Sequence, residues 1–326
     1  MRRAAAALLL AAAAATAVAG AASSLGVSSA RVDEFGASQP ATTAPGDARA
    51  PQLVSLEMLD TGIPNGKVDR VIATFDESLA AYSAGTAPWT LANVPSGGAL
   101  ASVTVSGTTA TLALTEGGGA ASTAVGTFTI GLASSASGIR DGAGNPASFG
   151  PTSPLDKAGP VPVTLTIGNG GTNDRADQND TISITWSERI KASTICTSVL
   201  SDSLTQTHSA NLNSGNRVRI EDHVATDRLS AAFDCGGFHF GSIALGSTAY
   251  ASATVDFGDN SQNGRSSLTW APSTATLTLT LGKPTNAGVL GTVAVAVTAT
   301  YTPDGLLTDA AGNAAVGTAS KTDTHF

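Results

Sequence analysis

Asp180-Thr-Ile-Ser-Ile-Thr-Trp-Ser-Glu188 is the stretch that decides the fold of this 326-residue chain. Its apolar side chains alternate with Ser and Thr, a period of two that is typical of a β-strand with one buried face. The same alternation returns in Ala275-Thr-Leu-Thr-Leu-Thr-Leu281 and across residues 249–257 and 292–301. Gly, Asn, Asp and Pro separate these segments, and a helical period is almost absent. The pattern predicts an all-β chain built from antiparallel β-sandwiches.

The first half of the chain shows the same alternation of apolar and polar residues. Asp69-Arg-Val-Ile-Ala-Thr-Phe-Asp-Glu77 alternates in the same way, and residues 126–132 form a further strand-like run. Residues 101–105 and 109–114 flank Ser106-Gly107, a dipeptide suited to a tight turn. We therefore expect a β-hairpin there.

An internal repeat divides the chain. The segment Asp47…Pro51 matches Asp156…Pro160 at an offset of 109 residues, and each segment would form the entry to one repeat unit. The predicted strand 69–77 matches 180–188 at an offset of 111. Residues 139–145 match 307–313 at an offset of 168, which is 57 larger. The offsets predict one unit over 47–155 and a second over 156–326, the second carrying an insertion at about 195–265.

The N-terminus indicates export. Arg2 and Arg3 precede an apolar run over residues 4–19, and Ala17-Val18-Ala19 offers a small-x-small cleavage site. The run is shorter than the roughly 20 residues that a membrane span needs, so we favour a signal peptide over an anchor. We predict a signal peptide over 1–21, a flexible Ala/Ser/Thr/Pro-rich spacer over 22–46, and a secreted chain with no transmembrane segment after cleavage.

The two cysteines fit an oxidising compartment. Cys196 and Cys235 are the only pair, and no CxxC motif points to zinc. A disulfide between them is the default expectation for an exported chain.

Composition limits the function. Lys and Arg number 17 against 25 Asp and Glu, giving a net charge of −8, and charged residues make up 13% of the chain. A chain without an excess of Lys and Arg is unlikely to bind the phosphate backbone, so we expect no nucleic-acid partner. The sequence contains no nucleophile elbow, HExxH, Walker loop or dinucleotide fingerprint, so we expect a protein that is not an enzyme. A secreted enzyme would require Asp222, His223 and His239 of the insertion to converge in one pocket.

The matched blocks resemble the bacterial immunoglobulin-like repeats of surface-layer and other exported proteins. Those repeats carry an Asp-Pro entry, a strand ending in an F-S-E-like turn and a late D-x-A-G-N turn. Here the strand ends are Thr74-Phe-Asp-Glu77 and Thr185-Trp-Ser-Glu188, and the late turns are 141–145 and 309–313. The resemblance implies two tandem Ig-like sandwiches with a role in spacing, adhesion or surface assembly, and it does not imply catalysis. Residues 195–265 depart from the pattern.

The acidic turns suggest a cation site. In a sandwich of this type, the domain entry, the turn after the second strand and the last hairpin lie at one end. Asp156, Glu188 and Asp309 would then gather at the top of the second unit, and the loop holding Asp60, Asn65 and Asp69 would face them from the bottom of the first. Such oxygen ligands suit Ca²⁺, although no cofactor is required, because the same side chains can simply cap their turns.

Three functions remain from these observations. We expect an exported structural or adhesive element at the cell surface, with protein or cell-envelope glycan partners. The alternative is a glycan- or ligand-binding module seated in the insertion, for which exposed Trp89 and Trp270 would supply stacking surfaces. Trp186 takes the position of Phe75 in the repeat and is expected in the core. The third function is the secreted enzyme described above.

Overall fold

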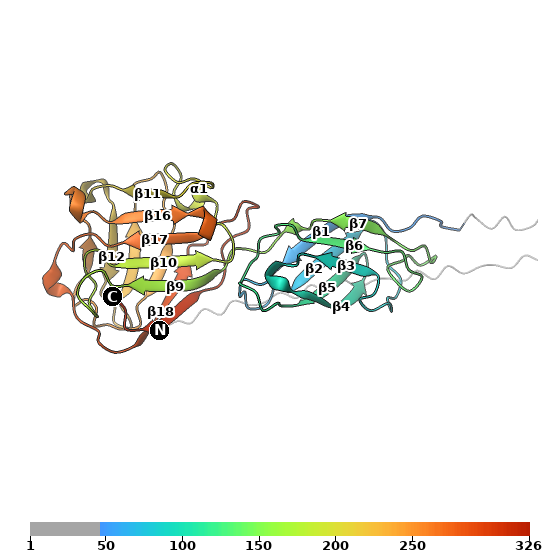
Figure 1. Ribbon diagram of the computed structural model, residues 1–326, viewed down its shortest axis with the longest axis horizontal. Helices are drawn as coiled ribbons and strands as arrows, with labels where there is room; N and C mark the ends of the chain where they lie inside the picture. The colour runs from blue at the N-terminus through green and yellow to red at the C-terminus, as the bar shows by residue number, and fades with distance from the viewer. Residues whose placement is uncertain (1–45) are drawn as a thin grey trace, which may run out of the picture. The chain divides into compact units, whose positions relative to one another are not determined.

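The computed structural model describes residues 46–326, which are built mainly from β-strands (Figure 1). The predicted signal peptide over 1–21 and all of the predicted spacer over 22–46 except Gly46 lie outside the described residues. The one α-helix described, α1 (Ala192–Ile195), has a single turn. Within residues 46–326, no helix has the length and apolar character needed to cross a membrane. The all-β prediction is confirmed for this part of the chain.

A first hydrophobic core lies between two sheets. One sheet has the order β4-β5-β2-β1-β8 and the other β3-β6-β7. Phe149 bridges them, since its ring lies 6.5 Å from that of Phe75 and 5.9 Å from that of Trp89. The strands are β1 (Leu53–Leu59), β2 (Arg70–Phe75), β3 (Trp89–Ala92), β4 (Ala99–Ser106), β5 (Thr109–Thr115), β6 (Thr129–Leu132), β7 (Phe149–Thr152) and β8 (Leu155–Asp156).

The β4–β5 hairpin forms where the sequence predicts it. Ser106 pairs with Thr109, and Gly107 takes a left-handed φ of +58° in the turn. That conformation is open to glycine at little cost, which explains why the two-residue turn, Gly107-Thr108, begins at this glycine.

A second core lies between a five-stranded sheet, β11-β16-β17-β10-β9, and a six-stranded sheet, β15-β12-β13-β14-β18-β19. Trp186 of the first packs edge-on against Tyr301 of the second, with ring centroids 5.8 Å apart. The strands are β9 (Pro162–Gly168), β10 (Thr181–Trp186), β11 (Gln206–Ser209), β12 (Arg217–Glu221), β13 (Arg228–Ala232), β14 (Gly241–Ala244), β15 (Val255–Phe257), β16 (Ser267–Ala271), β17 (Thr276–Thr280), β18 (Val297–Pro303) and β19 (Ala319–Asp323).

Residues 195–265 are part of the second core. β11 joins the five-stranded sheet, while β12 to β15 make up four of the six strands of the opposite sheet. Ile220, Leu229 and Phe257 from this stretch are fully buried. The predicted insertion is therefore an integral part of the core, which an offset between repeats cannot reveal.

Two predicted strands are shorter than the sequence suggests. Of residues 249–257, only 255–257 form a strand, and of residues 292–301 only those from Val297 onward do. Tyr250 is fully buried without belonging to a strand, and Ala251 makes one isolated bridge to Leu290. Alternating Ala, Ser and Val buries too little apolar surface to select a strand by itself, so tertiary packing decides these segments.

The sulfur atoms of Cys196 and Cys235 lie at disulfide-bonding distance, as the sequence predicts. The two Cα atoms are 5.5 Å apart, a separation typical of disulfides. Both residues are buried, and the bond joins the end of α1 to the segment after β13.

Candidate functional site

Two loops of the chain have the same hydrogen-bond pattern. Asp309 accepts hydrogen bonds from the backbone N–H and from the side-chain amide of Asn313, both at 2.8 Å. Asp141 accepts the same two bonds from Asn145, at 2.8 and 2.6 Å. In each loop the Asn amide also reaches a backbone carbonyl of the matching entry segment, at Asp156 or at Asp47. Turn capping, the structural role that the sequence suggests for D-x-A-G-N, is thus present at both places.

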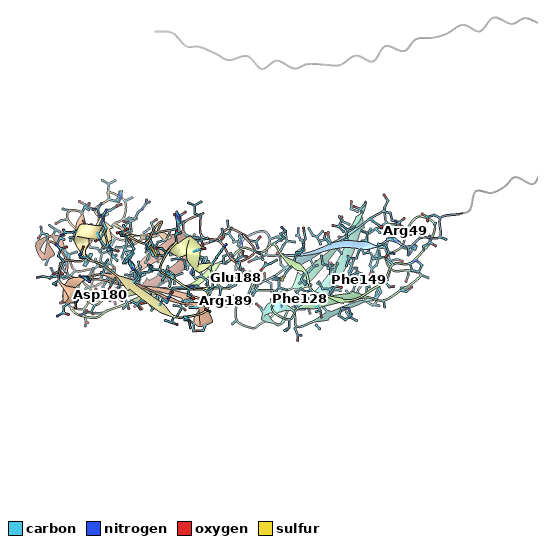
Figure 2. All side chains as sticks on the ribbon, turned by 90° about the horizontal axis from the view of Figure 1, so that it is seen from above. Arg49, Phe128, Phe149, Asp180, Glu188 and Arg189 are labelled. Carbon is cyan, nitrogen blue, oxygen red and sulfur yellow. A yellow bond between two sulfur atoms is a disulfide. The ribbon has the colours of Figure 1, made fainter. Side chains whose placement is uncertain are left out.

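Three carboxylates meet beside the second of these loops. Asp156 comes from β8, Glu188 follows the end of β10 (Figure 2), and Asp309 begins the capped loop. Oxygen atoms from all three lie within 4.8 Å of one another. The convergence that the sequence predicts for these residues is therefore observed.

An equivalent group forms in the first core. Asp47, Glu77 and Asp141, at the matching positions of the repeat, also bring carboxylate oxygens within 4.8 Å of one another. The neighbouring Asp76 forms an ion pair with Arg49. These three residues were not among the predicted site residues, although the repeat offsets of 109, 111 and 168 residues relate them to Asp156, Glu188 and Asp309.

Burial and mutual repulsion raise pKa values in the group formed by Asp156, Glu188 and Asp309. Glu188 is only 9% exposed, and burial, with added repulsion from Asp156 and Asp309, raises its pKa to about 8. Burial and the charge of Asp309 raise the pKa of Asp156 to about 6. The group thus holds a proton on Glu188 at neutral pH when no cation is present.

A buried polar contact joins this group to the first core. The hydroxyl of Thr123, fully buried, donates to Glu188 Oε1 at 2.6 Å and lies 2.7 Å from Ser187 Oγ. Ser187 Oγ also accepts the backbone N–H of Val161 at 3.0 Å. Thr123 and Ser187 were not among the predicted site residues, because nothing in the sequence marks a lone Thr and a lone Ser in two different loops as neighbours.

The other predicted cation ligands stay apart from the two carboxylate groups. Asp60 accepts the backbone N–H groups of Asn65 and Gly66, and Asp69 accepts the hydroxyl of Thr61. The amide of Asn65 donates to Glu116. Neither Asp60 nor Asp69 belongs to a group of three converging ligands among the described residues. These side chains instead close their own loop, since a carboxylate facing several backbone N–H groups is satisfied locally.

Trp89 and Trp270 do not form a binding platform. Trp89 is 6% exposed and donates its indole N–H to Tyr82, and Trp270 is fully buried. An aromatic ring must be accessible to stack on a sugar, so the structure contradicts this assignment. Trp186 is buried, as the repeat predicts.

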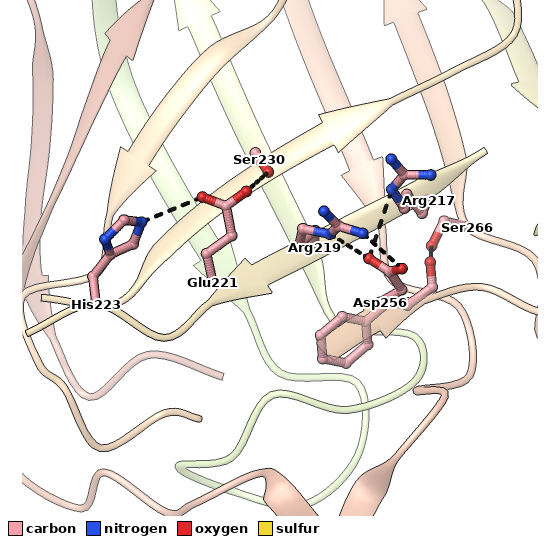
Figure 3. A network of polar contacts seen from close by, with 8 residues as sticks. Arg217, Arg219, Glu221, His223, Ser230, Asp256 and Ser266 are labelled. Carbon is pink, nitrogen blue, oxygen red and sulfur yellow. Dashed lines mark hydrogen bonds and ion pairs between the residues drawn. The ribbon is translucent and has the colours of Figure 1, made fainter. Parts of the chain in front are cut away.

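The polar residues of 195–265 separate into different contacts. His223 Nε2 lies 3.4 Å from Glu221, which also faces Ser230 (Figure 3). His239 Nδ1 lies 3.1 Å from Asp304 instead. Further along the same sheet, Arg219 makes two bonds to Asp256. The convergence of Asp222, His223 and His239 that a catalytic centre would need does not occur among the described residues.

The Ca²⁺ site at Asp156, Glu188 and Asp309 stays a prediction, and the donor set fits a hard cation. Ca²⁺ binding would displace the proton on Glu188, so its effect should grow as the pH rises. We expect Ca²⁺ at about five times its Kd to raise stability by about 1 kcal/mol, or roughly 2–4 °C in Tm, relative to EDTA at pH 8. Thermal unfolding of the wild type and of an Asp156→Ala/Asp309→Ala variant measures this. An equal shift in both proteins would place the ion elsewhere, and no shift would leave the carboxylates as caps.

Comparisons with protein families, with characterised proteins and with solved structures find no match to this chain.

Proposed function

We propose that this chain is an exported, non-enzymatic structural element of the cell surface, in which two Ig-like sandwiches are joined in tandem by a stiff polar junction. The observation that carries the proposal is the buried contact of Thr123 with Ser187 and Glu188. The matching hydrogen bonds at Asp141 and Asp309 support the tandem relation of the two halves. The apolar run after Arg2 and Arg3 supports export.

A flexible linker would leave such a contact open to water. Thr123 is fully buried and its hydroxyl has two partners across the junction, so bending there would break both bonds and expose polar groups of both halves. Exchanging each of these hydrogen bonds for bonds to water costs roughly 0.5–1.5 kcal/mol, which disfavours the bent state. A fixed angle between successive sandwiches suits a protein that sets a distance from a surface.

A close approach of the Gly66 backbone to the second half is a further contact of the junction. A Cβ atom at Gly66 would lie 2.9 Å from the Cβ of Ser187 and 3.0 Å from a methyl group of Val163. Both neighbours belong to the second half, so any larger residue at 66 would push the halves apart. Gly62, in the same loop, has a similar positive φ, +77° against +81°, but no atom lies within 4 Å of its Cβ position.

The pair Gly66→Val and Gly62→Val therefore separates junction contact from backbone strain. We expect the two halves of the wild type and of Gly62→Val to tumble with one rotational correlation time, measured by backbone ¹⁵N relaxation. Gly66→Val should give two shorter correlation times, one for each half, because the added methyl groups open the junction.

Independent tumbling of the halves in the wild type would contradict the stiff junction. A fractionation experiment on the producing cell tests the remaining part of the proposal. Retention of the chain in the cytoplasm with residues 1–21 attached would contradict export.

A further inference from the structure

The edges of the four sheets differ in how they are protected. Unpaired edge strands invite pairing with another chain, and proteins block this with short strands, prolines, charged side chains or covering elements. β19 carries Lys321 and Asp323, β7 contains Pro151, and β9 starts at Pro162 and packs against β18 and β19. The edges β3, β8, β11 and β15 have at most four residues each.

β4 lacks all four of these protections, and the only bulge in its pairing with β5 lies near its start. It is the longest of the edge strands, with eight residues, Ala-Leu-Ala-Ser-Val-Thr-Val-Ser, and contains neither a charge nor a proline. Within residues 46–326, its only partner strand is β5. Its one irregularity, a register shift between Leu100 and Ser102, leaves residues 102–106 as a regular exposed edge.

The apolar flank of the strand is also open. Val103 and Val105 pack on the first core yet remain only partly buried. At the start of β4, a hollow of about 280 Å³ lies between Trp89 and Leu91 of β3 and Ala99 and Leu100 of β4. The side of the first sandwich between β3 and β4 is thus uncovered by the rest of residues 46–326.

The strand is complementary to itself. Residues directly opposite each other in an antiparallel pair share a face. A twofold axis at Thr104 would set Val103 of one copy opposite Val105 of the other, on the core side. Thr104 would face its own counterpart on the solvent side, where its side chain is exposed. This register matches apolar with apolar residues and brings no charges together.

We propose that β4 is a docking edge for a second copy of this chain, through antiparallel β4–β4 pairing that joins two five-stranded sheets into one. The inference goes beyond the proposed function and does not depend on it, since a monomer could equally act as a spacer. Five paired residues make a small interface, so the association should be concentration-dependent and favoured where copies are crowded on a surface.

Two lysine variants test the pairing. Thr104→Lys would set like charges opposite each other at the axis and should weaken dimerisation at least about tenfold. Thr111→Lys is the matched control: Thr111 is the direct neighbour of Thr104 on β5 and shares its face, but not the edge. Dimerisation is measured by light scattering over a wide concentration range, and the Tm of both variants should equal that of the wild type.

A cysteine pair gives a second readout. Opposed Cα atoms at the axis would be about 4.5–5.5 Å apart, within reach of a disulfide. Under oxidation, Thr104→Cys should therefore form a covalent dimer and Thr111→Cys should not. A wild type that stays monomeric, equal dimerisation of the two lysine variants, or equal cross-linking of the two cysteine variants would overturn the proposal. Loss of dimers on deletion of residues 22–45 would assign the association to that segment and would also overturn it.

Discussion

Replacing both Cys196 and Cys235 by alanine lowers the free energy of unfolding by about 3–4 kcal/mol. The bond closes a loop with 38 residues between its ends, and opening a loop of that size restores roughly this much chain entropy to the unfolded state. The loop contains β11, β12 and β13. The segments that gain conformational freedom in the unfolded state are therefore those that form strands of both sheets of the second core. Both cysteines are buried, and the lost sulfur contacts act in the same direction.

Urea unfolding of the double variant, beside the wild type with and without a reductant, measures this change. The reduced wild type should unfold close to the variant, because both lack the same covalent link. The first core should unfold at an unchanged urea concentration if it unfolds separately. A loss below about 1 kcal/mol would mean that the unfolded chain keeps these segments together without the bond.

Glu188→Gln stabilises the protein at pH 8 in the presence of EDTA, by at most about 4 kcal/mol. The pKa of Glu188 is about 8 in the folded state and 4.5 for an ordinary Glu. Between these values the folded state keeps a proton that the unfolded state has released, so stability falls as the pH rises from about 4.5 to about 8. Glutamine is neutral throughout and removes this fall. The Thr123 hydroxyl keeps a partner, since the glutamine side chain also offers an acceptor oxygen.

Chemical denaturation of both proteins at pH 5 and pH 8 tests this prediction. The two curves should nearly coincide at pH 5 and separate at pH 8. Glu77→Gln is the comparison variant, because Glu77 occupies the corresponding place in the first group but is less buried, and its Oε1 has no hydrogen-bond partner. Burial and the neighbouring carboxylates raise the pKa of Glu77 as well, so Glu77→Gln should show a smaller gain in stability at pH 8. A Glu188→Gln protein that is less stable than the wild type at pH 8 in EDTA would mean that Glu188 is ionised in the folded state.

The candidate site could be predicted in part because its three carboxylates belong to repeated motifs. Asp156, Glu188 and Asp309 each occupy a fixed place in the repeat, so their order along the chain was enough to expect them at one end of a sandwich. The same logic failed for Asp60 and Asp69. Their carboxylates bind N–H and O–H donors within their own loop, and that local competition has no signature in residue spacing.

Burial of the tryptophans could not be inferred from their positions. Trp89 begins β3 and Trp270 lies in β16, on strands too short or too polar in pattern for the sequence to assign a face. The repeat assigned a face only to Trp186, because Phe75 stands at the matching position. A single aromatic residue carries no period, so its environment follows from packing alone.

The sequence by itself determined the all-β character of this chain, the β4–β5 hairpin, the disulfide and the meeting of Asp156, Glu188 and Asp309. Each of these depends on local information: an alternating pattern, a turn dipeptide, a lone pair of cysteines, or a motif that occurs twice. Only the tertiary structure decided that residues 195–265 complete both sheets of the second core, that Thr123 contacts Glu188, and that β5 is the only partner strand of β4 within residues 46–326. These features depend on which distant segments become neighbours, and that outcome follows from burial and close packing over the whole chain.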